Sequence, residues 1–420
     1  MHFALITVGT RGDAQPFVAV GAQLKRRGHR VTVATHEDHR ALVEGAGLTL
    51  RPICGDIRAL LETPAGRSWL GSGENIFAYA KAFRELFQPL AERWMRDEAA
   101  ATDGADVIVG HLMATGAWFG AEKRGLPYLL LCPYPSLASG RIALAPAGEL
   151  PLVGPLINRL GWRYFEKICS APFADAAHRV RTDLGLPPSE PNVWNVLRAR
   201  KTPYLHCYSE AVLPKPPDWP DYAEVTGWCA LEAPTSWRPP AELLRFLDGG
   251  DALYVGFGSM TGMDQEVLAR ITVAALRRTK RRAVLCSGWG GLAIARSGDD
   301  LFCIDDVPHD WLFARVAAVV HHGGAGTFAA SLRAGKPTLV VPFFGDQPMW
   351  GRFAGRLGVG PKPLPKKKLT EERLAARIVE LADPKYAARA AELGRAFSVE
   401  DGAARTAERI LALSPPASWL

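Results

Sequence analysis

The sequence predicts two doubly wound α/β domains, each with a parallel sheet that helices cover on both faces. In both halves of the chain, short apolar stretches rich in β-branched residues alternate with segments of helical periodicity. The chain has 420 residues, more than a single hydrophobic core usually organises. A proline-rich stretch at residues 213–220 separates the halves. We therefore expect two domains facing a cleft, with ligands bound beyond the carboxyl ends of the strands.

The elements of the first half follow from its apolar runs and its helical spacings. Predicted strands span residues 3–8, 30–35, 106–109 and 128–131, and predicted helices span residues 16–27, 37–46 and 75–95. The helix over residues 75–95 carries several aromatic side chains, including Phe77. These aromatic side chains suit either ordinary core packing or the wall of an apolar pocket.

The second half repeats this alternation around a second set of strands. Predicted strands span residues 252–257, 283–286, 301–304, 316–320 and 338–341. Proline density over residues 214–240 resists both helix and sheet, so this stretch is predicted to be the linker. The predicted domains then span residues 1–213 and 241–400, and residues 401–420 hold a last helix.

The amino-acid composition limits which kinds of protein this chain can be and which partners it can bind. The net charge of +7 and the pI near 9.1 favour an anionic partner, such as a phosphorylated ligand or an acidic membrane surface. No nucleic-acid-binding motif is present, so we expect no nucleic acid partner. The seven cysteines are dispersed, which is typical of reduced thiols in a cytoplasmic protein. No apolar stretch is long enough to cross a bilayer, and no basic segment precedes the first strand, so we expect neither a membrane span nor a signal peptide.

The first predicted strand runs into a short turn that contains glycine. Residues 9–16 read Gly-Thr-Arg-Gly-Asp-Ala-Gln-Pro, and a helix follows. Asp13 is therefore expected at or near the helix N-cap, on the rim of the cleft. It could be a structural capping residue or a general base directed into the cleft. The two interpretations are compatible, because a cap fixes the direction of the side chain.

A second turn follows the predicted strand over residues 316–320. It reads His321-His322-Gly323-Gly324-Ala325-Gly326-Thr327 and leads into a helix. A strand, a glycine turn and the start of a helix together present backbone N–H groups to a phosphate. Thr327 can add a hydroxyl donor, and His321 can stabilise the charge that builds on a leaving group.

The next strand brings a polar pair to the same crevice. It ends in Pro-Phe-Phe-Gly followed by Asp346 and Gln347. A carboxylate can accept hydrogen bonds from neighbouring sugar hydroxyls, and an amide can both accept and donate. Phosphate donors beside such a pair indicate a nucleotide-sugar site.

The residues alone leave other interpretations open. Residues 324–329 also fit a G-x-G-x-x-A dinucleotide fingerprint with Asp346 about 20 residues further on, which would suit an NAD(P)-dependent oxidoreductase. The turn could also be purely structural. A zinc site at His321 and His322 is excluded, because adjacent strand residues point to opposite faces and no third ligand is evident.

These motifs resemble the family 1 glycosyltransferases of the GT-B fold, especially the sterol 3-beta-glucosyltransferases and the bacterial antibiotic glycosyltransferases of the vancomycin and macrolide type. The resemblance covers both domains and rests on residues 8–16, 306–313, 321–327 and 342–347. It implies that Asp13 is the catalytic base and that His321 contacts the β-phosphate of the donor. It also implies that the last helix crosses back to the N-terminal domain.

The resemblance implies a full set of donor-binding residues. The set consists of Gly258, Ser259, the backbone near Val307, His321, the turn formed by Gly323, Gly324, Ala325, Gly326 and Thr327, and the sugar-binding pair Asp346 and Gln347. Plant relatives stack uracil on a tryptophan that is missing near Asp306 in this chain. Trp289 could lie nearby instead, so the choice between UDP and TDP stays open.

The implied reaction is an inverting transfer of a hexose, with UDP-glucose as the favoured donor, to a hydroxyl of a lipophilic small molecule such as a sterol or a polyketide. Helix amides, His321 and Thr327 would stabilise the leaving diphosphate, so no metal or other cofactor is expected. Thr10, Phe77 and His111 are the candidate acceptor-pocket residues. A sugar-nucleotide-binding protein without turnover is a further alternative, although an intact Asp13 argues against it.

Overall fold

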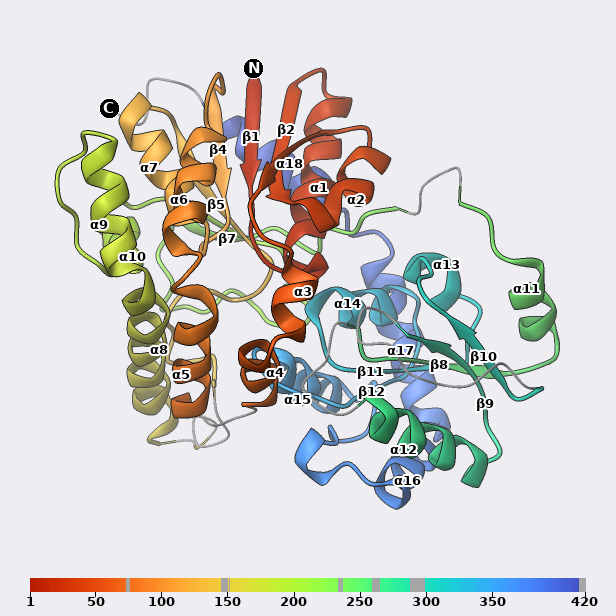
Figure 1. Ribbon diagram of the computed structural model, residues 1–420. Coiled ribbons are helices and arrows are strands. Elements are labelled where there is room, and N and C mark those ends of the chain that lie inside the picture. Colours follow the sequence, from red (N-terminus) through yellow and green to blue (C-terminus); the bar gives the residue numbers. More distant parts are fainter. Residues whose placement is uncertain are drawn as a thin grey trace. The chain divides into compact units, whose positions relative to one another are not determined.

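The computed structural model describes residues 1–72, 76–144, 150, 152–232, 237–258, 265–287 and 299–414. They pack into two compact units. Unit 1 comprises Met1–Leu60, Ile76–Leu231 and Asp401–Leu420, and unit 2 comprises Leu61–Asn75 and Glu232–Glu400. Each unit is built on its own parallel sheet, which confirms the two α/β domains (Figure 1). Among the described residues, no helix is both long and apolar enough to cross a bilayer.

Unit 1 has a seven-stranded parallel sheet in the order β3-β2-β1-β4-β5-β6-β7. Its strands are β1 (His2–Ile6), β2 (Arg30–His36), β3 (Thr49–Ile53), β4 (Val107–Gly110), β5 (Tyr128–Cys132), β6 (Tyr204–His206) and β7 (Ala223–Val225). Every residue of β1, β4 and β5 is buried, which explains why these strands are continuous apolar runs rather than alternating ones.

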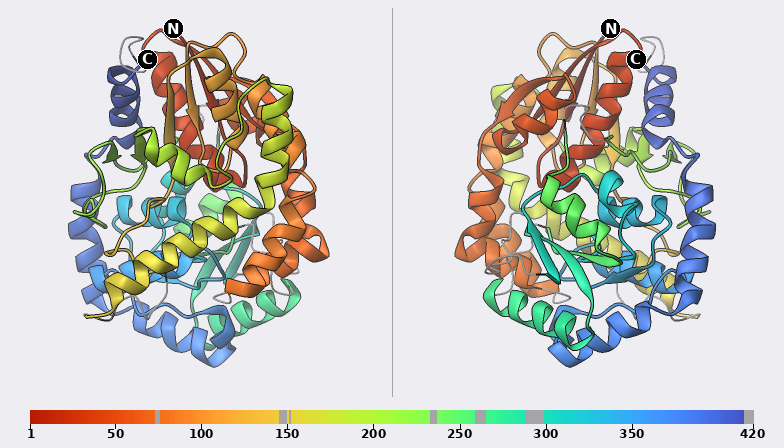
Figure 2. Two further views of the ribbon diagram at one scale, coloured as in Figure 1. Left: turned by 90° about the vertical axis from the view of Figure 1, so that its left-hand side faces the viewer. Right: turned by 90° about the vertical axis from the view of Figure 1, so that its right-hand side faces the viewer.

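Helices cover both faces of this sheet. They are α1 (Arg11–Arg26), α2 (Arg40–Gly45), α3 (Ile57–Glu62), α5 (Ile76–Phe87), α6 (Ala91–Ala100), α7 (Thr115–Arg124), α8 (Gly154–Ser170), α9 (Ala174–Asp183), α10 (Val193–Ala199) and α18 (Gly402–Ala412). The last helix, α18, packs beside α1 near the start of the chain (Figure 2). It contributes Ala403, Ala407 and Ile410 to the core around Phe17.

Close backbone contact fixes the start of α18. A side chain at Gly402 would place its Cβ 2.3 Å from the backbone of Gly227, so only glycine fits there. One turn later, the hydroxyl of Thr406 donates to that of Thr226 at 2.7 Å. These contacts hold the last helix against the loop that follows β7.

Unit 2 has a five-stranded parallel sheet in the order β10-β9-β8-β11-β12. Its strands are β8 (Ala252–Gly256), β9 (Arg282–Cys286), β10 (Leu301–Ile304), β11 (Ala318–His321) and β12 (Thr338–Val340). Its helices are α4 (Pro64–Gly71), α11 (Ala241–Asp248), α12 (Gln265–Arg278), α13 (His309–Phe313), α14 (Ala325–Arg333), α15 (Gln347–Leu357), α16 (Glu371–Leu381) and α17 (Pro384–Phe397). One of these helices, α4, comes from the first half of the chain.

Three details differ from the sequence predictions. The single helix predicted over residues 75–95 is two helices, α5 and α6, because Pro89 interrupts the helical hydrogen bonds between them. The helix predicted to begin at Pro16 begins at Arg11 instead, and Pro16 lies inside it. The predicted linker over residues 214–240 contains strand β7, which pairs with β6 at the edge of the sheet.

Candidate active site

The order of strands in unit 1 reverses direction at one particular place. The chain lays β2 and β3 on one side of β1 and then returns to add β4 on the other side. Ligands of doubly wound sheets bind at such a reversal, beyond the carboxyl ends of the strands. Asp13 follows β1 and His111 follows β4, so both side chains lie at this reversal. The amide of His111 donates to the carbonyl of Ile6 at 2.8 Å, which fixes its position against β1.

One carboxylate oxygen of Asp13 is held by the turn before the helix. Oδ2 accepts from the backbone N–H of Thr10 at 2.8 Å and from its hydroxyl at 3.1 Å. Asp13 is therefore the third residue of α1, and Thr10 is the N-cap. Gly9, with φ +121°, has no room for a side chain, because its Cβ would lie 2.4 Å from Oδ2. The other oxygen, Oδ1, lies 4.0 Å from Nε2 of His111.

His111 is enclosed, and its ring nitrogens make no hydrogen bond within the described part of the chain. The side chain is 2% exposed, whereas that of Asp13 is 22% exposed. The rings of Phe17 and Tyr134 meet the imidazole edge to face at 6.1 and 6.3 Å. Burial lowers the pKa of His111, and the nearby charge of Asp13 opposes that shift only in part. The imidazole is therefore neutral and retains both a donor and an acceptor for a ligand.

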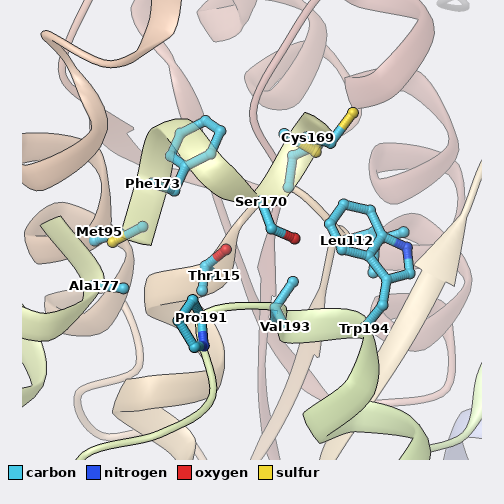
Figure 3. Close-up of a pocket in the computed structure, with 11 residues that line it drawn as sticks. Met95, Leu112, Thr115, Cys169, Ser170, Phe173, Ala177, Pro191, Val193 and Trp194 are labelled. Carbon is cyan, nitrogen blue, oxygen red and sulfur yellow. The ribbon is translucent and has the colours of Figure 1, made fainter. Parts of the chain in front are cut away.

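A small apolar cavity begins just after His111 (Figure 3). It is lined by Met95, Leu112, Met113, Thr115, Cys169, Ser170, Phe173, Ala177, Pro191, Val193 and Trp194. Its volume of about 20 Å³ suits a water molecule, not a polycyclic acceptor. The cavity is a small gap between α6, α8 and α10, and it is not by itself an acceptor site.

In unit 2, three neighbouring strands bring the donor candidates together. β11 lies between β8 and β12, and His321 pairs in register with Gly256 on one side and Val340 on the other. The turns that follow these three strands therefore meet at one edge of the sheet. Gly258, with φ +60°, belongs to the first of these turns, and its Cβ would lie 3.1 Å from the ring of His322.

The glycine turn after β11 opens directly into a helix. Gly324 is the N-cap of α14 and offers no side chain to cap it. The amides of Ala325, Gly326 and Thr327 form the first turn, where an N–H group has no acceptor within its own helix. A Cβ added at Gly326 would meet no atom of the described residues within 4 Å. An anion fits such a position.

The hydrogen bond between His321 and Gly323 determines which ring nitrogen can donate. Nδ1 of His321 accepts from the backbone N–H of Gly323 at 3.0 Å. Burial, followed by the neighbouring imidazoles of His322 and His309, lowers the pKa of His321 well below its usual value. In the neutral ring the proton must then sit on Nε2. That nitrogen is buried and makes no hydrogen bond among the described residues, which leaves a donor beside the helix start.

Gly323 is required where it stands. Its φ is +94°, and an added Cβ would lie 2.6 Å from Val340 and 3.0 Å from the carbonyl of Gln347. The turn therefore packs directly on the segment that follows β12. Any side chain at this position would push the two turns apart.

Asp346 and Gln347 brace the turn after β12. Oε1 of Gln347 accepts from the amides of Phe343 and Phe344 at 2.8 and 3.3 Å. Oδ2 of Asp346 accepts from the indole N–H of Trp350 at 2.6 Å. These contacts fix the directions of both side chains. Sugar recognition by the pair stays a prediction.

One aromatic residue of this turn contacts a helix that the sequence analysis missed. Phe344 meets the ring of Trp69 on α4 at 5.0 Å and 66°. Helix α4 begins with the side chain of Thr63 accepting from the amide of Gly66 at 3.0 Å, and Pro64 occupies its first turn. The dipeptide Thr63–Pro64 was a helix start signal available in the sequence. Nothing in the sequence indicated that this helix packs in unit 2.

The remaining candidates fall in different places. Val307 is buried in the core of unit 2, in the loop between β10 and α13. Thr10 anchors Asp13, and its place in an acceptor pocket stays a prediction. Phe77 lies on α5 with 73% of its surface exposed. Ser259 and Trp289 lie outside the described residues.

Comparison with known proteins identifies the family. The model of the Glycosyltransferase family 28 N-terminal domain matches residues 3–139, and that of the Erythromycin biosynthesis protein CIII-like C-terminal domain matches residues 293–413. The chain is 34% identical to O-mycaminosyltylonolide 6-deoxyallosyltransferase of Streptomyces fradiae, over 96% of its own length and 95% of that enzyme. The chain belongs to this glycosyltransferase family.

The glycosyltransferase is also 35% identical to a sterol 3-beta-glucosyltransferase of Arabidopsis thaliana, over 96% of its own length and 64% of that enzyme. The chain thus spans less than two thirds of this plant relative. Among solved structures, the glycotransferase of kitacinnamycin has a TM-score of 0.70 at 21% identity, and glycosyltransferase VinC in complex with dTDP has one of 0.68 at 18%. Each comparison covers 99% of both chains and shows the GT-B fold. These relatives are sugar transferases, so the oxidoreductase alternative for residues 324–329 has no support.

Proposed function

We propose that this glycosyltransferase moves a hexose from a nucleoside diphosphate sugar to a hydroxyl of a lipophilic small molecule such as a sterol or a polyketide. The names of the relatives support this range of acceptors, since one acts on sterols and another on a macrolide. UDP-glucose is the favoured donor, because Asp346 and Gln347 suit a fully hydroxylated hexose. Because VinC was solved in complex with dTDP, a TDP sugar remains the alternative donor.

The donor side carries the proposal. His321 is neutral, and its only unpaired N–H is buried beside the uncapped start of α14. This arrangement suits the binding of a diphosphate and does not suit a purely structural turn. The proton of Nε2 on His321 and the first amides of α14 would bind the phosphate oxygens. As the bond to the sugar breaks, the same groups stabilise the added negative charge. The step therefore needs no metal ion.

The acceptor side supplies the base. The proposed reaction is a single displacement, in which the acceptor oxygen bonds to the anomeric carbon and the nucleoside diphosphate leaves from the opposite face, so the configuration inverts. Asp13 takes the proton of the attacking hydroxyl through Oδ1. The gap of 4.0 Å between Oδ1 and His111 Nε2 exceeds a hydrogen bond, but a hydroxyl oxygen can lie about 2.8 Å from both atoms. His111 would then position the acceptor hydroxyl.

Thermal shift measurements with nucleotides test the donor assignment. UDP or TDP should raise the melting temperature of the wild-type protein, and NAD and NADP should not. His321→Ala should abolish the shift, whereas His178→Ala, at an exposed position on α9, should retain it. A nucleoside diphosphate that stabilises His321→Ala as well as the wild type would refute the proposed site. Mass spectrometry against a panel of sterol and polyketide acceptors then identifies the acceptor.

A further inference from the structure

Helix α8 exposes a ridge of large apolar side chains. Leu156, Leu160 and Tyr164 follow one another at intervals of four, so they lie along one face. They are 62%, 58% and 43% exposed. Leu152 lies four residues before Leu156, just ahead of the helix, and is 94% exposed. An amphipathic helix usually buries such a ridge, so this one is available to a partner.

A second ridge, also spaced by four, runs beside the first and is entirely basic. It consists of Arg159, Arg163 and Lys167, which are all exposed. The guanidinium of Arg159 lies 3.6 Å from Asp218 and is 61% exposed. The acidic residue of the helix, Glu166, is 1% exposed and binds Arg198 at 2.6 Å. The outer side of α8 therefore carries positive charge and no negative charge.

Neighbouring segments of unit 1 extend the apolar ridge. Leu144 is 41% exposed, and its side chain lies 3.8 Å from the Cβ position of Gly161 on the helix. Helix α5 lies beside α8 through the rings of Tyr79 and Phe165, which are 6.2 Å apart, and it exposes Phe77. Figure 2 (left) shows α8, in yellow, along the surface nearest the viewer. We call Leu144, Phe77 and the two ridges the α8 surface.

The composition of this surface decides between possible partners. A second copy of the chain would place one basic ridge close to another, and like charges in contact oppose association. A bilayer that contains anionic lipids can bind both ridges. The leucine and tyrosine side chains enter the boundary between headgroups and acyl chains, and the arginine and lysine side chains remain at the lipid phosphates. Basic residues near such a surface strengthen its attraction.

We propose that the α8 surface docks this protein on anionic lipid bilayers. The docking goes beyond sugar transfer, because it concerns where the enzyme binds and not what it catalyses. It also suits a lipophilic acceptor, which accumulates in bilayers and would be met there. Binding can be measured with no donor present, so its outcome is independent of the proposed reaction.

The experiment uses the full chain and phosphatidylcholine vesicles with and without phosphatidylglycerol, in a co-sedimentation assay. The wild type should bind the vesicles that contain phosphatidylglycerol and release them at high salt. Leu156→Asp with Leu160→Asp, and separately Arg163→Glu with Lys167→Glu, should each weaken binding at least about tenfold. The matched control is Val379→Asp on α16, a valine that is 64% exposed, and it should bind like the wild type.

Circular dichroism and thermal unfolding establish that each variant is folded. Failure of the wild type to bind, or equal binding by the α8 variants, would overturn the proposal. It would also be overturned if the leucine variants abolish self-association and leave vesicle binding intact. Vesicle binding by a protein that transfers no sugar would contradict the proposed function alone.

Discussion

Asp13 Oδ1 faces His111 Nε2 at 4.0 Å across the ends of two adjacent strands of unit 1. The two residues are 98 positions apart in the sequence, and the pairing of β1 with β4 brings them together. Thr10 orients the carboxylate of Asp13 by donating to its other oxygen, Oδ2, and aromatic rings enclose the imidazole of His111. An oriented oxygen beside a neutral, buried imidazole forms a site for one polar hydrogen, which an acceptor hydroxyl would supply.

Replacing Asp13 with asparagine tests the base. The amide keeps an oxygen for Thr10 but cannot take a proton, so kcat should fall about 10²–10⁴-fold. Affinity for UDP or TDP, measured by calorimetry, should not change. Turnover close to that of the wild type would remove Asp13 from the reaction.

Thr10 is expected to act by orienting Asp13. Thr10→Val removes the hydroxyl that donates to Oδ2 and retains the backbone N–H, so kcat should fall about tenfold with little change in the KM of the donor. Thr10→Ser keeps the hydroxyl and should restore turnover. If both variants lose activity equally, the hydroxyl is not the cause.

Substitutions at two glycines can distinguish a phosphate-binding turn from a turn that is purely structural. Gly326→Ala adds a methyl group at a position with no described atom within 4 Å, so stability should be unchanged or rise by up to about 1 kcal/mol. The same methyl should obstruct a phosphate at the helix start and weaken UDP or TDP binding at least about tenfold. Gly323→Ala, with its Cβ 2.6 Å from Val340, should instead destabilise the fold. Normal nucleotide binding by Gly326→Ala would favour the structural turn.

Buried histidines should make unit 1 less stable in mild acid. Burial lowers the pKa of His206 to about 3 and that of His36 to about 4, against about 6.5 in the unfolded chain. Below pH 6.5 the unfolded state binds more protons, so the free energy of unfolding should fall as the pH drops from about 6.5 to 4. Urea titrations across this range measure the slope. His206→Phe, which retains stacking on Trp219, should reduce the slope, and the exposed His178→Ala should not.

Glu98 should produce the opposite slope at higher pH. It is buried, accepts from the amide of Gly116 at 2.7 Å, and has its pKa raised to about 8 by burial. Between the unfolded value near 4.5 and about 8, the folded state binds the extra proton, so stability should decline as the pH rises through this window. Glu98→Gln, which cannot ionise, should remove that decline between pH 6.5 and 8. An unchanged slope would mean that Glu98 is already charged in the folded protein.

The sheets were largely predictable because their signal is local. β1 and β5 are buried on both faces, and a short apolar run is enough to indicate such a strand. The break at Pro89 also had a local signal, but the surrounding aromatic periodicity favoured one continuous helix. β7 has three residues and depends on pairing with β6, so its own sequence says little.

The candidate site likewise has some features that the local sequence predicts and others that it does not. The turn at Gly323 and Gly324 and the position of Asp13 after β1 follow from nearby residues. The tautomer of His321 depends on the backbone of Gly323, and the brace between Asp346 and Trp350 depends on a turn of helix, so neither is visible as a motif. The contact by which Thr10 orients Asp13 is also local, because the two residues lie three apart and form a capping box at the start of α1.

Helix α4 has a consequence for how the protein assembles. The chain leaves unit 1 after Leu60, contributes Trp69 to the surroundings of Phe344, and re-enters unit 1 at Ile76. It crosses again after Leu231 and after Glu400. A fragment truncated between the halves would lack α18 and would leave Trp69 without its aromatic neighbour. The two units are therefore interwoven along the polypeptide, and neither can be excised with a single cut.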